Sequence, residues 1–151
     1  MKKIVLLAFL LMLNIKASAQ DNIVYDKALA DSLGADEYGM KMYILVILKS
    51  GSNKTEDVKV LDSLFGGHLA NIGRLANEGK LIVAGPMSKN DKNYEGIFIL
   101  NVKTLKEAKE LLSTDPAINA NLLDPELYGW YGSAALPMFL PFHKKIQKTK
   151  M

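Results

Sequence analysis

The sequence predicts an α+β fold in which the elements follow one another as strand, helix, strand, strand, helix, strand. Two observations support it. Short runs rich in apolar and β-branched residues are typical of strands, and two longer segments carry apolar residues at steps of three and four, as amphipathic helices do. In this order the elements form a ferredoxin-like βαββαβ sandwich. The 151 residues suffice for one such domain with its own core.

The first predicted strand covers 42–48, an apolar run with several β-branched residues. The hydroxyl and two acids of Thr55-Glu56-Asp57 indicate the start of the first long helix. A hydroxyl there accepts from a free backbone N–H, and negative charge interacts favourably with the helix dipole. Its apolar spacing continues to about Glu78, and Gly79 is well placed to end it.

The remaining elements have similar boundary signals. Apolar runs predict strands over 81–84, 96–102 and 127–131. Thr104 followed by Glu107 is a capping box that opens the second helix. Asp115-Pro116 predicts one further short helical turn, with the aspartate as its N-cap.

The two ends of the chain differ from this central domain. Two lysines after Met1, the apolar run 4–13 and Ala17-Ser18-Ala19 are typical of a secretory signal peptide. We therefore expect cleavage after Ala19 and export to the periplasm or the medium. The predicted parts are a signal peptide (1–19), an N-terminal extension with a short helix at 26–33 (20–40), the α+β domain (41–136) and a basic C-terminal tail (137–151).

Charge and composition exclude several classes of protein. The net charge of +3 equals the three lysines of the predicted signal peptide, so the mature chain is balanced and predicts no nucleic-acid partner. The absence of cysteine excludes disulfides and thiol chemistry. The first apolar run is about half the length needed to cross a bilayer, and later runs are shorter, so we expect no stable membrane anchor.

The strands predict a homodimer. A sheet with one wet face alternates apolar and polar residues, but 42–48 and 97–100 are apolar at successive positions. Both faces of the sheet should therefore be covered. Because one helical layer covers only one face, a second copy of the chain packed face to face is the economical cover for the other.

His68 is the principal candidate for chemistry. It lies seven residues after Leu61 and four before Ile72, so it faces the sheet together with the apolar side chains. It could be a core histidine bonded to a carbonyl, or an acid–base group. Gly66-Gly67 precedes it and indicates close approach of another backbone or of a ligand.

An aspartate could orient this histidine. Asp115 and Asp124 each precede a proline and could cap a helix, yet a capping aspartate can also bind Nδ1 and leave Nε2 to take a proton. The sequence has no G-x-S-x-G elbow, which argues against a nucleophilic serine, and no phosphate-binding loop. It also has no metal-ligand spacing, so we expect no bound metal. Trp130, with Tyr128 and Tyr131, could line a pocket or pack in a core.

The segments Gly67–Met87 (GHLANIGRLANEGKLIVAGPM), Ala108–Pro116 (AKELLSTDP) and Leu127–Tyr131 (LYGWY) resemble the YCII-related family. The resemblance covers roughly 40–136 and implies a dimeric α+β barrel. It also implies a His–Asp active-site pair, which falls on His68 and Asp115 here.

The resemblance implies a small cyclic or aromatic compound as ligand, because related dimeric α+β barrels include isomerases, lyases and monooxygenases that act on such compounds. Among these reactions we expect proton transfer, as elimination or isomerisation, because it needs no cofactor. The alternative to an enzyme is a non-catalytic dimer that binds or senses a small molecule. We expect the ligand to contact Tyr43, Gly85, Pro86 and Trp130. The C-terminal tail could separately serve as a partner-docking strip.

Overall fold

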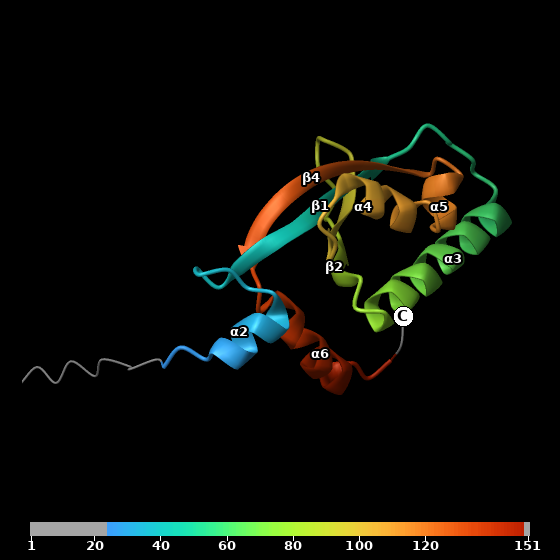
Figure 1. The fold of residues 1–151 in the computed structure, drawn as a ribbon. Coiled ribbons are helices and arrows are strands. Elements are labelled where there is room, and N and C mark those ends of the chain that lie inside the picture. Colours follow the sequence, from blue (N-terminus) through green and yellow to red (C-terminus); the bar gives the residue numbers. More distant parts are fainter. Residues whose placement is uncertain (1–23, 150–151) are drawn as a thin grey trace, which may run out of the picture.

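A computed structural model describes residues 24–149, so the predicted signal peptide lies outside the described part of the chain. Four antiparallel strands form one sheet in the order β2-β3-β1-β4, and the helices α3, α4 and α5 lie on one face of it (Figure 1). This is the predicted ferredoxin-like α+β arrangement. The strands are β1 (Met40–Ser50), β2 (Leu81–Pro86), β3 (Tyr94–Leu100) and β4 (Leu123–Ser133). The helices are α2 (Lys27–Leu33), α3 (Val58–Asn77), α4 (Leu105–Leu112), α5 (Pro116–Asn119), the 3-10 helix η2 (Leu136–Phe139) and α6 (Leu140–Ile146).

Most of the predicted helix boundaries agree with the structure. Asp26 caps α2, Asp115 caps α5, and Thr104 and Glu107 form the predicted capping box of α4. Gly79 follows α3 with φ +69°, a left-handed conformation that glycine adopts without a steric cost.

Several predicted boundaries differ from the structure: β3 covers Tyr94–Leu100 rather than 96–102, and β1 extends two residues beyond each end of 42–48. The N-cap of α3 is Asp57 rather than Thr55, because the Asp57 carboxylate accepts the first free N–H groups of the helix, from Lys59 and Val60. β4 begins at Leu123, four residues earlier than predicted. Asp124 is therefore a strand residue and caps no helix.

Alternate residues of β1 build the core between sheet and helices. Ile44, Val46 and Leu48 point to the helical face and are almost fully buried. They pack in one cluster with Leu75 of α3 and Phe98 of β3. Burial of this apolar cluster attaches α3 to the sheet and so fixes the helix that carries His68.

The opposite face of the sheet is also largely apolar. The half-buried side chains of Leu45, Ile47, Ile97 and Ile99 come from the two central strands. In Figure 1 no helix of the described residues lies over the middle of this face of the sheet. The strands lack the alternation of apolar and polar residues because both faces of the sheet are apolar.

The C-terminal segment is helical, whereas the sequence predicted an irregular basic tail. η2 and α6 fold back beside α3, and Lys144 Nζ donates to Asn77 Oδ1 at 3.2 Å. Proline at the first turn of each short helix fixes φ at a helical value and explains why the prolines do not break it. Within residues 24–149 no helix is both long and apolar enough to cross a membrane.

Candidate active site

His68 faces the sheet, as its spacing predicted, and only 9% of its surface is exposed. The preceding residue explains how another element comes so close to it. A Cβ on Gly67 would lie 2.8 Å from Pro116 Cγ, so α3 and α5 can touch here only because residue 67 has no side chain. Gly66 and Gly73 have open space around them. The close approach therefore belongs to Gly67 alone among these three glycines.

Asp115 lies at the start of α5 and is fully buried. Its Oδ1 accepts hydrogen bonds from the backbone N–H of Ala117 at 3.0 Å and of Ile118 at 3.4 Å, as an N-cap does. Its Oδ2 lies 2.7 Å from His68 Nδ1. The same carboxylate thus caps a helix and binds the imidazole.

The charge of Asp115 determines the direction of this hydrogen bond. Burial alone would raise the pKa of its carboxyl, but the hydrogen bond and charge of His68, the Ile118 N–H and the Asn71 amide outweigh it, so the pKa of Asp115 lies below its ordinary value. An ionised carboxylate only accepts, so His68 Nδ1 must donate. In the neutral imidazole Nε2 then carries the free lone pair.

Nε2 is accessible from outside the core. It has no hydrogen-bond partner among the described residues. Every fully buried side-chain nitrogen or oxygen atom of those residues does have a partner. Nε2 must therefore keep some accessible surface. This is the arrangement that a general base requires, with one nitrogen held and the other free.

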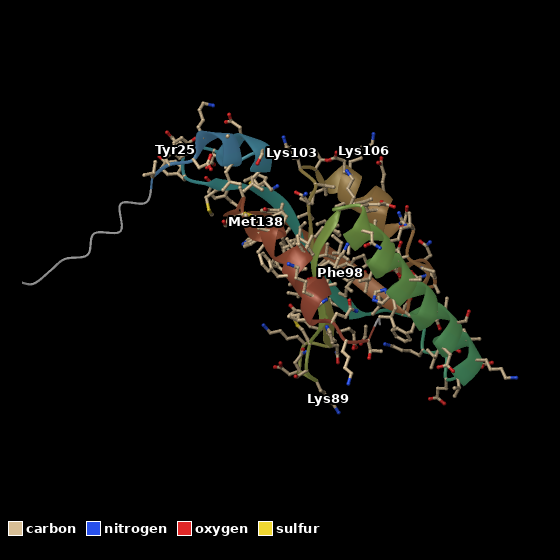
Figure 2. The ribbon with its side chains drawn as sticks, turned by 90° about the horizontal axis from the view of Figure 1, so that it is seen from below. Tyr25, Lys89, Phe98, Lys103, Lys106 and Met138 are labelled. Atoms are coloured by element: carbon tan, nitrogen blue, oxygen red, sulfur yellow. The ribbon has the colours of Figure 1, made fainter. Side chains whose placement is uncertain are left out.

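Two aromatic rings hold the imidazole in place. The ring of Phe98 stacks on His68 with centroids 5.8 Å apart, and Phe65 presents its edge at 6.4 Å. Figure 2 shows Phe98 in the middle of the molecule beside α3, while Lys89 and Lys106 lie at its periphery. The imidazole is thus in contact with two aromatic rings.

A cavity of about 710 Å³ lies beside His68, between α3, the adjacent strands and the β1–α3 loop. Its walls are mostly apolar side chains from α3 and the sheet. They include Leu48, Leu61, Phe65, Ile72, Ala84 and Phe98. The volume and the lining are those of a pocket for a small and largely apolar ligand.

A β-bulge brings a second polar group to this cavity. β1 and β3 pair Leu48 with Gly96 and then Lys49 with Tyr94, which leaves Glu95 as the extra residue. A bulge re-aims the side chain that it carries. The Glu95 carboxylate accepts a hydrogen bond from Ser50, and both residues line the cavity. Sequence reasoning missed this pair because nothing in the residue pattern marks a bulge.

The structure brings some of the predicted site residues together and separates others. Gly85 and Pro86 line the cavity with His68. Tyr43 and Trp130 pair across β1 and β4, with their rings 5.7 Å apart, and they are not among the residues that line it. Tyr43 alternates with the core residue Ile44, so it points to the opposite face of the sheet. The cavity beside His68 therefore does not include these two aromatic residues, and their contact with a ligand stays a prediction.

Asp124 also lies away from His68. It points to the open face of the sheet, where Lys49 Nζ lies 3.3 Å from its carboxylate and 2.6 Å from that of Glu126. Of the two aspartates that the sequence left as candidates, the structure places Asp115 against the imidazole. Within residues 24–149 no three histidine and acidic side chains gather in the manner of metal ligands.

The sequence analysis also missed the polar neighbours of the pair. Asn71 is buried on the same face of α3, and its Nδ2 lies 3.4 Å from Asp115 Oδ2. Arg74 Nη2 donates to Asn71 Oδ1 at 2.8 Å. The spacing 68, 71, 75 on one helical face was the available signal, because it places Asn71 between His68 and the core residue Leu75.

The fold and this cavity define a ferredoxin-like α+β domain with a ligand-sized site on its helical face. The family model of the YCII-related domain matches residues 42–128, which is more than half of the chain. The chain therefore belongs to the YCII-related family. No match was found among curated proteins.

The solved structures to which the chain is similar include that of 5-chloro-2-hydroxyhydroquinone dehydrochlorinase (TftG) from Burkholderia phenoliruptrix in complex with 2,5-dihydroxybenzoquinone. The two share 21% identity and align with a TM-score of 0.41. The alignment covers 58% of this chain and 92% of the other.

Proposed function

We propose that this protein is a small enzyme in which His68 moves a proton on a small cyclic or aromatic compound. The observation that carries the proposal is the 2.7 Å contact between His68 Nδ1 and Asp115 Oδ2 beside an apolar cavity. A histidine that only stabilised the fold would need neither an ionised partner nor access to a cavity. The aromatic walls around His68 favour a ligand with an apolar ring.

The proposed chemistry follows from the two nitrogens of His68. Asp115 accepts the Nδ1 proton and orients the ring, so Nε2 removes a proton from the ligand. The imidazolium formed is stabilised by the adjacent carboxylate. The electron pair left on the ligand either expels a leaving group, which is elimination, or forms a new double bond while the proton returns to a different atom, which is isomerisation. Neither route requires the protein to supply electrons, and neither includes a step at a cofactor.

Turnover by the mature protein tests this proposal. A thermal-shift screen of small cyclic and aromatic compounds selects ligands, and NMR then follows loss of a ligand proton in deuterated water. We expect His68→Ala to abolish that exchange and any net reaction, with a nearly unchanged Tm. Unchanged exchange in His68→Ala would show that His68 is not the base.

A second function uses the same cavity without turnover. The protein could be a non-catalytic dimer that binds or senses a small molecule, which the largely apolar lining equally supports. The two functions differ in one measurement, because a binding protein would protect its ligand and exchange no ligand proton. Saturable binding without exchange in the unmodified protein would favour this second function.

We also propose that the protein acts as a homodimer. The support is the open face of the sheet, where Leu45, Ile47, Ile97 and Ile99 are only half-buried in the single chain. Covering this apolar surface is favourable, and two-fold symmetry would pair each sheet face with itself. Light scattering after size-exclusion chromatography measures the mass directly, and a stable monomer at micromolar concentration would refute the dimer.

We propose further that the protein is exported and begins at Gln20. The support is the sequence of residues 1–19 alone, with its lysines, apolar run and Ala17-Ser18-Ala19 site. N-terminal sequencing of protein recovered from the periplasmic and extracellular fractions tests this. Recovery of protein with Met1 intact from the cytoplasm would contradict it.

A further inference from the structure

The Asp115 carboxylate is surrounded by hydrogen-bond donors. Ala117 and Ile118 donate to Oδ1, while His68 and Asn71 approach Oδ2 at 2.7 Å and 3.4 Å. Two of the four are backbone N–H groups, which can only donate, and the third, His68 Nδ1, donates as long as the Asp115 carboxylate is ionised. The fourth is an amide, which could in principle turn and present its oxygen instead. A turn of the Asn71 side chain would therefore replace a hydrogen-bond donor to Asp115 by an acceptor.

Arg74 fixes the orientation of that amide. A guanidinium only donates, so the Asn71 atom 2.8 Å from Arg74 Nη2 has to be the oxygen. The amide nitrogen then has to face Asp115. Turning the amide would place its NH2 group against a cation and its oxygen against a carboxylate, which are two unfavourable contacts in place of two favourable ones.

Arg74 is itself held by two further side chains. Its Nη1 donates to Glu78 Oε1 at 2.8 Å, and its Nη2 also donates to Thr114 Oγ1 at 2.8 Å. The Arg74 side chain is 45% exposed, whereas Asn71 is buried. A continuous polar chain thus runs along one face of α3 from the surface to the imidazole.

We propose that Asn71, clamped by Arg74, is a positioning residue that keeps Asp115 a hydrogen-bond acceptor and so fixes the direction of the His68–Asp115 hydrogen bond. With the amide free to turn, a protonated Asp115 could donate to Asn71 Oδ1, and the imidazole would lose its ionised partner. The clamp removes that option. This inference rests on the proposed function only in assuming that the His68–Asp115 pair takes part in proton transfer. The hydrogen bonds from which it is argued are those of the protein without a ligand.

Carboxyl 13C NMR of Asp115 against pH, on the free mature protein, tests this role. Asn71→Leu replaces the amide by a side chain of comparable size that cannot donate, and Arg74→Lys keeps the charge but loses the planar fork. We expect both variants to raise the pKa of Asp115, because the first loses a donor to the ionised form and the second lets the amide accept from the neutral form. Asn77→Ala is the matched control: the same residue type on the same helix, bound only to Lys144 at the surface. It should leave the Asp115 titration unchanged.

Each result has a defined meaning. An Asp115 titration in Asn71→Leu identical to that of the unmodified protein would reduce Asn71 to a packing residue and overturn the proposal. A rise in Asn71→Leu without one in Arg74→Lys would refute the clamp. If Asn71→Leu fails to fold, Arg74→Lys, a change of a half-exposed side chain, still decides.

The turnover assay separates this inference from the proposed function. Where a turned-over compound is available, Asn71→Leu should lose roughly twofold to tenfold in kcat/KM, the worth of one hydrogen bond. Ligand exchange that persists in His68→Ala would refute the proposed function while leaving the Asp115 titration, and hence the role of Asn71, intact.

Discussion

Gly67 of α3 lies directly against the ring of Pro116 at the start of α5, where even a methyl group would come within 2.8 Å of Pro116 Cγ. The residues on either side of this contact are the candidate pair: His68 follows Gly67, and Asp115 precedes Pro116. The absence of one side chain therefore sets the distance between imidazole and carboxylate. Packing and chemistry are coupled at this crossing of two helices.

Gly67→Ala should disturb this crossing. The rigid Pro116 ring cannot rotate away, so we expect a loss of about 1–3 kcal/mol in the free energy of unfolding, as for other overpacked sites, and a weakened His68–Asp115 hydrogen bond. Urea denaturation measures the first, and the 1H shift of the His68 Nδ1 proton measures the second. Gly66→Ala is the control, because its Cβ would meet nothing; we expect a gain of about 0.5–1 kcal/mol from the better helix former. Equal effects at both positions would exclude the steric explanation.

Asp115→Asn should change how stability depends on pH. The pKa of Asp115 is lowered in the folded protein, so its contribution to stability is fully present above the unfolded value near 4. It is lost as the pH falls through the lower, folded pKa. The asparagine variant lacks this contribution but keeps a good N-cap. In urea denaturation the difference in unfolding free energy between the two proteins should therefore shrink below pH 4, and a difference that grows there would contradict the lowered pKa.

Ala84→Leu should fill the cavity beside His68. Ala84 pairs with Phe98 and lines the cavity, while the adjacent Val83 pairs with Ile99 on the other face of β2. We expect Ala84→Leu to weaken binding of any ligand selected by thermal shift at least tenfold, because the added isobutyl group occupies its space. Isothermal titration calorimetry measures the Kd. Val83→Leu adds apolar volume to the same strand and should bind normally; equal loss in both variants would place the ligand elsewhere.

Glu95→Gln should weaken ligand binding through the polar side of the cavity. The bulge turns Glu95 to the cavity, where its carboxylate accepts from Ser50 and can accept from a ligand donor. We expect the Kd of donor-bearing ligands to rise about tenfold, the worth of one charge-assisted hydrogen bond. Glu56→Gln, a second acid at the cavity without the Ser50 contact, serves as the control. If Glu95→Gln binds such ligands as the unmodified protein does, the pair is not a ligand contact.

Leu45→Glu should separate the proposed dimer. Leu45 lies at the centre of the open sheet face, between Ile99 of β3 and Tyr128 of β4. A buried carboxylate at each copy of that position would be unpaired and strongly unfavourable. Light scattering should report half the mass of the unmodified protein with an unchanged circular dichroism spectrum. The Met42→Glu control lies on the opposite face, and we expect it to stay dimeric.

Local sequence rules predicted the elements whose boundaries depend on short-range hydrogen bonds. The Thr104–Glu107 box and the stop at Gly79 are of this kind, since each partner lies within a few residues. Helical spacing also placed His68 toward the sheet. These features need no knowledge of tertiary contacts.

The features that the sequence did not predict depend on registers between distant segments. The bulge at Glu95 exists only in the pairing of β3 with β1, and the face occupied by Tyr43 follows from the strand phase. The residue pattern alone left Asp115 and Asp124 as alternatives, because the choice depends on where β4 begins, and only the family resemblance favoured Asp115. The helix after Leu136 escaped prediction because its segment has two prolines and no capping residue with a side-chain hydrogen bond.

The most direct test of the central claim is the 15N NMR spectrum of the His68 imidazole in the mature protein, recorded where the ring is neutral. An ionised Asp115 that accepts from Nδ1 predicts a protonated Nδ1 and an unprotonated Nε2, ready to take a proton from a ligand. A neutral ring protonated at Nε2, with Nδ1 bare toward Asp115, would contradict the account.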